Sequence, residues 1–140
     1  MAGRERAVPE QHNAGAVVCQ LRFREPLRLD AERLAALYVT LGEARARRAV
    51  AGALREMAAL AAGAPARRRG VAGHDPREAT QRAGEIAEAL GLVAVARAAC
   101  DVLDAEEAGD APAAAATRAR LARLGAEAAR SVSRIQDLSG

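Results

Sequence analysis

Aromatic side chains are scarce in this sequence: Phe23 and Tyr38 are the only two, and there is no tryptophan. Since 51% of the residues are hydrophobic all the same, the core must be built from alanine, leucine and valine. Alanine has the highest helix propensity and little bulk, so alanine-rich helices pack closely, whereas sheets favour β-branched and aromatic residues. The composition therefore predicts an all-α fold.

Lysine is missing altogether. All 21 basic residues are arginine, and 18 acidic residues reduce the formal net charge to +3. A basic balance can indicate a nucleic-acid partner. Here the acids are interleaved with the arginines, and the sequence has neither aromatic stacking groups nor a recognisable recognition helix. An arginine-rich helical nucleic-acid binder is therefore kept as an alternative only.

Cysteines and long apolar runs are also few. Cys19 and Cys100 stand far apart, in no CxxC or metal-ligand spacing, which is typical of small apolar residues in a reducing compartment. No apolar stretch approaches the roughly 18 residues that a membrane span needs, and the N-terminus lacks the apolar region of a secretion signal. We expect a cytoplasmic protein with no membrane segment, metal or cofactor.

Helix start and stop signals divide the chain. Asp30, Asp75 and Asp110 stand at candidate N-caps, Pro76 occupies a first helical position, and Glu78 suits a capping box. Glycine is expected to end a helix at the left-handed C-terminal position. These signals predict helices over residues 31–41, 43–61, 76–90, 92–108 and from 110 nearly to the C-terminus.

Each predicted helix carries apolar residues at helical spacing, which indicates an antiparallel four-helix bundle with an extra short N-terminal helix or arm. Residues 29–140 would form this bundle domain and residues 1–28 a flexible tail or arm. Within the tail, residues 16–23 (AVVCQLRF) read either as a strand or as an extended arm laid on the bundle. In the last helix, apolar residues recur at alternating spacings of three and four and form a continuous seam. This seam predicts packing inside a monomer or, at its C-terminal end, contact between two copies in a homodimer. The predicted stripes are Leu34, Leu37, Tyr38 and Leu41; Ala46, Val50, Ala53, Leu54, Met57 and Leu60; Ala79, Ala83, Ile86, Ala87 and Leu90; Leu92, Val95, Ala96, Ala99, Val102 and Leu103; and Thr117, Leu121, Leu124, Ala128, Val132, Ile135 and Leu138.

No catalytic centre is evident. His12 lies in the tail and His74 just before a helix cap, and neither has a cysteine, serine or acid at nucleophile spacing other than Asp75, which is assigned to capping. There is no P-loop, no GxGxxG after a strand and no HExxH. The sequence predicts a protein that is not an enzyme and that acts by binding another protein.

The order of turns and helices resembles the histidine-containing phosphotransfer (HPt) domain family over roughly residues 29–130. Residues 77–124 resemble the family's helical hairpin: Leu90 and Gly91 match the turn that ends its phosphohistidine helix, and Gly109 and Asp110 match the end of the next helix. The resemblance implies an HPt-type four-helix bundle that takes part in two-component phosphorelay signalling. The implied partner is a response-regulator receiver domain or a histidine kinase.

The family's His-x-x-Lys-Gly motif is absent. Counting back from Leu90 places Gln81 in the histidine position, Gly84 in the lysine position and Glu85 in the glycine position. Glutamine has no nucleophilic imidazole nitrogen, so we expect a degenerate member that binds its partner without carrying phosphate. The alternative is an active phosphotransfer protein that uses His74.

The helical period places one face of the 76–90 helix opposite its apolar stripe. We expect this face to be exposed and to bind the partner. For Gly84, two roles stay open: a flat spot for close approach of the partner, or helix–helix packing. The predicted partner-binding residues are Arg77, Gln81, Arg82, Gly84, Glu85 and Glu88.

Overall fold

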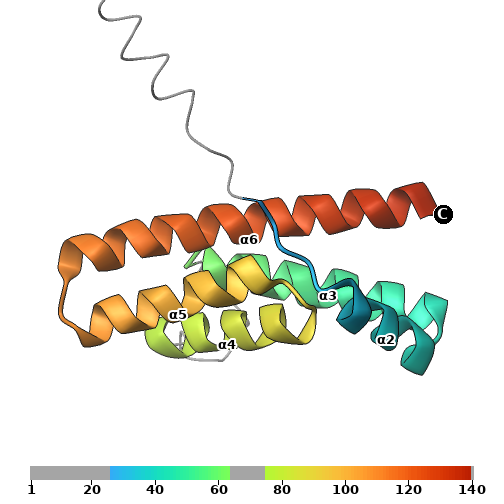
Figure 1. Cartoon of the computed structure of the whole chain (residues 1–140), viewed down its shortest axis with the longest axis horizontal. Helices are drawn as coiled ribbons and strands as arrows, with labels where there is room; N and C mark the ends of the chain where they lie inside the picture. Colours follow the sequence, from blue (N-terminus) through green and yellow to red (C-terminus); the bar gives the residue numbers. More distant parts are fainter. Residues whose placement is uncertain (1–25, 64–74, 140) are drawn as a thin grey trace, which may run out of the picture.

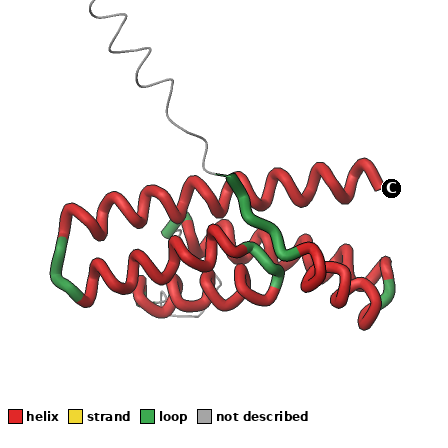
Figure 2. Tube along the Cα trace, in the orientation of Figure 1, coloured by secondary structure: helices red, strands yellow, loops and turns green. Residues whose placement is uncertain are grey.

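The computed structural model describes residues 26–63 and 75–139, and in these ranges every regular element is an α-helix (Figure 2). The all-α prediction is confirmed. The helices are α2 (Ala31–Leu41), α3 (Glu43–Ala61), α4 (Pro76–Ala89), α5 (Val93–Glu107) and α6 (Ala111–Ser139). The short helix predicted before the bundle is α2. Most of the predicted tail, including residues 16–23, lies outside the described residues.

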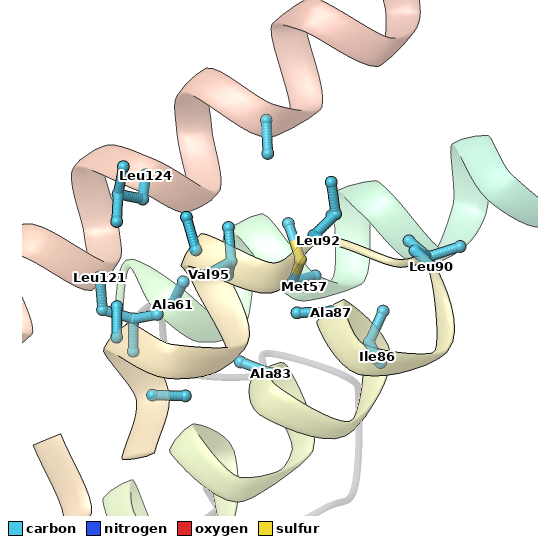
Figure 3. Close-up of a cluster of buried hydrophobic side chains, with 14 of the residues drawn as sticks. Met57, Ala61, Ala83, Ile86, Ala87, Leu90, Leu92, Val95, Leu121 and Leu124 are labelled. Carbon is cyan, nitrogen blue, oxygen red and sulfur yellow. The ribbon is translucent and has the colours of Figure 1, made fainter. Parts of the chain in front are cut away.

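The helices α3, α4, α5 and α6 surround one core, with α5 packed against α4 and α6, and α3 packed against the same two helices. Successive helices run in opposite directions, as Figure 1 shows. The core is built from aliphatic side chains, most of them the predicted alanine, leucine and valine. The largest that are almost fully enclosed are Leu54, Met57, Leu92 and Leu124. Figure 3 shows how leucine, valine and alanine from all four helices meet there.

The predicted stripes of α3, α4 and α6 face this core. In α6, Leu121, Leu124, Ala128 and Val132 are all buried, while the side chains of Ile135 and Leu138 lie outside the described residues. The described part of the seam therefore packs inside one chain.

Two predicted stripes need correction. On α2 the stripe is at best half-buried and Leu41 is 39% exposed, because this helix packs mainly on α3 and contributes no buried residue. On α5, Ala96 and Leu103 are only partly buried, whereas Ala94 and Ala98, which the stripe omitted, are buried. The reason is that α5 packs against both α4 and α6, so its buried face is wider than a single stripe.

The predicted helix starts are formed by side-chain caps. Asp30 accepts a hydrogen bond from the amide of Arg33 at 3.3 Å, and Asp75 accepts one from the amide of Arg77 at 3.3 Å. Asp110 caps α6 through the amide of Ala113 at 3.0 Å. These bonds satisfy amides that have no partner within their own helix.

A short backbone pairing that the sequence did not predict fastens the start of α2 to the α4–α5 turn. Leu29 and Leu92 form an isolated antiparallel bridge. The amide of Asp30 donates to the Gly91 carbonyl at 2.7 Å, and the amide of Val93 donates to the Arg28 carbonyl at 3.0 Å. The Arg33 guanidinium adds a 2.7 Å bond to the carbonyl of Glu88. The position of α2 is thus set by the turn that ends α4.

Two glycines inside helices give a first prediction. A Cβ at Gly125 of α6 would lie 2.9 Å from the Ala61 Cβ of α3, whereas a Cβ at Gly52 of α3 meets nothing within 4 Å. Gly52→Ala should therefore raise the free energy of unfolding by about 0.5–1 kcal/mol, the helix-propensity gain. Gly125→Ala should lower it by about 1–3 kcal/mol, because overpacking outweighs that gain.

Urea unfolding followed by far-UV circular dichroism measures both variants. Two changes of the same sign would contradict the close approach of α3 and α6.

Candidate functional site

An open groove of about 660 Å³ runs between α4 and α5 on the outside of the bundle. Four of the six residues predicted from the sequence line it: Gln81, Gly84, Glu85 and Glu88, all on α4. They recur every three or four residues and so follow one face of the helix. The groove is the feature that brings most of the predicted site together.

The α4 wall is polar and acidic. The side chains of Gln81, Glu85 and Glu88 are exposed, as predicted. Gly84 is not: it is half-buried, and a Cβ there would lie 3.1 Å from the Cβ of Ala99 on α5. Of the two roles left open for Gly84, this contact supports helix–helix packing, since the missing side chain lets α5 approach and forms the bottom of the groove.

The α5 wall is largely apolar. Val93, Ala96 and Leu103 line it together with Arg97 and Cys100, and Val93 is 42% exposed. Cys100 is a free and exposed thiol. The groove therefore combines an apolar surface with carboxylates on the opposite side, an arrangement suited to a segment that carries both apolar and basic residues.

The start of α2 closes one end of the groove. Asp30, Arg33 and Gly91 line this end, where the backbone pairing and the Arg33 bond to the Glu88 carbonyl hold them. The sequence missed this contribution because the pairing joins backbone groups far apart in the chain. The N-cap at Asp30 was the nearest available signal, and it predicts a helix start without saying what lies beside it.

The other two predicted residues lie outside the groove. Arg82 bonds Glu56 of α3 at 3.3 Å through Nε and pairs with Glu85 at 3.7 Å through Nη1. Arg77 is exposed in the first turn of α4 and is not among the residues that line the groove. Of the six predicted residues, four thus form one wall of the groove, and the two arginines lie beside it.

Within residues 26–63 and 75–139, no group of three histidine, cysteine or acidic side chains is placed to hold a metal ion. His12, His74 and Cys19 lie outside these ranges. In the same ranges, no helix combines the length and the apolar character required to cross a membrane.

No family model, no curated protein and no solved structure matches this chain.

Proposed function

We propose that this protein is a binding module that docks a partner protein over the α4–α5 groove and carries no phosphate itself. The observation behind the proposal is that one groove gathers Gln81, Gly84, Glu85 and Glu88 opposite an apolar wall. Binding sites for other molecules are concave, with an apolar surface and a few polar groups that fix orientation. More specifically, we propose that the chain is a degenerate HPt-like regulator in phosphorelay signalling.

The resemblance to HPt domains gains support from the turns that carried it. Gly91 and Gly109 both have positive φ, 75° and 68°, directly after α4 and α5. Asp110 then caps the next helix. The side chains of Gln81, Glu85 and Glu88 on α4 are exposed. Under the proposal, this face corresponds to the partner-binding face of the family's phosphohistidine helix, with Gln81 in place of the histidine. The proposed partner is therefore a receiver domain of a response regulator, or a histidine kinase.

A binding titration tests this proposal. Purified receiver domains from the same organism are titrated calorimetrically into the full chain, and Gln81→Arg is compared with the unmodified protein. We expect Gln81→Arg to weaken binding by about tenfold or more, roughly 1.4 kcal/mol, because a long charged side chain would stand on the docking surface.

Two arginine reversals show which face is used. Arg77→Glu alters an exposed arginine that flanks the groove, and Arg123→Glu makes the same change on the exposed surface of α6. Under the proposal Arg77 contacts an acidic group of the receiver domain beside the groove, so the first reversal should weaken binding, whereas the second should leave it unchanged. Equal affinities for the Gln81→Arg, Arg77→Glu and unmodified chains would reject the docking face, and no affinity for any receiver domain would reject the partner class.

The phosphotransfer alternative has its own readout. Incubation with a phosphorylated receiver should leave no acid-labile label on this chain. Label that disappears in His74→Gln would replace our proposal with active phosphotransfer.

A further inference from the structure

The apolar wall of the groove is only partly covered by the described chain. Val93 is 42% exposed, and Ala96 and Leu103 further along α5 are half-buried. From Val93 to Leu103 this wall extends about 15 Å along the helix axis. An apolar strip bordered by carboxylates offers a surface that suits the apolar side of another segment.

The described chain begins beside this wall. Pro26, its first described residue, lines a second, smaller cavity of about 120 Å³ on α5 and α6. Val93 and Arg97 line both this cavity and the groove. The residues that precede Pro26 therefore join the described chain beside the groove, separated from it only by Val93 and Arg97.

Those preceding residues include the apolar segment 16–23. Every second residue in its later part is apolar or a thiol: Val17, Cys19, Leu21 and Phe23. In an extended conformation such residues share one side, and eight residues span about 26 Å. The pattern suits a strip that has one apolar side, and about five extended residues are enough to cover its length of about 15 Å.

The charges of the α4 wall agree as well. Arg22 lies within the segment and Arg24 directly after it, while Glu85 and Glu88 line the α4 wall of the groove. Glu85 also pairs with Arg82, and Arg33 and Arg97 line other parts of the groove, so the attraction is local to the α4 wall. Arginine and carboxylate groups form the strongest side-chain hydrogen bonds, and complementary charge selects the orientation of a docked segment.

We infer that residues 16–23 of the same chain occupy the α4–α5 groove. The arm packs its apolar side on α5 and presents its arginines to the carboxylates of α4. A regulatory consequence rests on the proposed function: a receiver domain must displace the arm, which competes at the effective concentration of a tethered segment.

The two native cysteines test this arrangement in the full chain without any partner. Cys100 lines the groove and Cys19 lies in the middle of the segment. A disulfide forms only when the two Cα atoms come within about 7 Å. Oxidation with diamide at low protein concentration should therefore give an intramolecular disulfide.

A matched control removes the effect of tethering alone. Cys100 lies three residues beyond Arg97, and Arg123 of α6 lies three residues beyond Arg120, and both arginines line the small cavity beside Pro26. In a Cys100→Ser, Arg123→Cys chain, the thiol lies on α6, three residues beyond an arginine of the same small cavity but outside the groove. We expect the native pair to close about tenfold faster, because docking raises the local concentration of the thiol.

Alkylation of Cys100 supplies a second readout. In a Cys19→Ser chain, Cys100 should react with iodoacetamide about tenfold more slowly than in the same chain carrying Leu21→Asp and Phe23→Asp, because the docked arm shields the thiol. Equal alkylation rates, equal closure rates, or disulfides formed only between two copies would each overturn the inference. None of these outcomes depends on whether a receiver domain binds.

Discussion

Gly91→Ala should lower the free energy of unfolding by about 3–4 kcal/mol. The backbone at Gly91 has φ +75°, where a side chain costs about 1–2 kcal/mol. A Cβ at this position would also lie 2.7 Å from the backbone oxygen of Asp30, which has to move away. That movement breaks the bridge and the hydrogen bond from the Asp30 amide to the Gly91 carbonyl, and so releases the start of α2.

Gly109 is the matched control for this substitution. Gly109 follows α5 as Gly91 follows α4. Its φ is +68°, and a Cβ at this position would meet nothing within 4 Å. Gly109→Ala should therefore cost about 1 kcal/mol, the conformational penalty less the lost entropy of the unfolded chain. Urea unfolding of both variants gives the difference directly. Equal losses would show that the start of α2 does not depend on close contact with the turn.

Leu124→Ala should lower the free energy of unfolding by about 3–4 kcal/mol, near the middle of the range for buried leucines. Leu124 is 1% exposed and belongs to the core that all four helices share. Many residues of that core are alanines, which have no side-chain torsions with which to fill a cavity. The lost contacts and the cavity that remains both destabilise the folded state.

A leucine of α2 provides the comparison. Leu41 is 39% exposed, so Leu41→Ala should cost about 1 kcal/mol or less, part of it offset by the higher helix propensity of alanine. The two variants are measured by chemical denaturation at the same pH and salt concentration. A loss at Leu124 no larger than that at Leu41 would contradict the single shared core.

The helices were predictable because their ends are determined by local chemistry. Asp75 followed by Pro76 is a start signal that works through neighbouring amides, and the glycines at positions 91 and 109 end helices because they adopt positive φ. Such signals act within one turn of the chain. The printed sequence therefore contains all that is needed to read them.

The groove was only half predictable. Helical spacing alone identified Gln81, Glu85 and Glu88 as one exposed face of α4. The composition of the opposite wall depends on which side of α5 faces solvent when that helix packs against two neighbours at once. Ala96 therefore lines the groove, although the predicted stripe placed it among the buried residues. The covered end at Asp30 and Arg33 depends on a backbone pairing between distant segments, for which side-chain patterns give no signal.

The arginines show the same limit. Arg82 pairs with Glu85 on α4 at 3.7 Å, but its shorter bond, at 3.3 Å, goes to Glu56 of α3. This exposed pair contributes little to stability, at most about 1 kcal/mol. Its orientation nonetheless separates Arg82 from the groove, and only the packing of α4 on α3 establishes it.

The central claim is that a partner docks on the α4–α5 groove, and the most direct test is backbone amide NMR of the full chain titrated with a receiver domain that binds it. We predict that the largest chemical-shift changes fall on residues 81–88 of α4 and 93–103 of α5, with small changes on the outer surfaces of α3 and α6. Changes centred on those outer surfaces, with the groove residues unaffected, would contradict the claim.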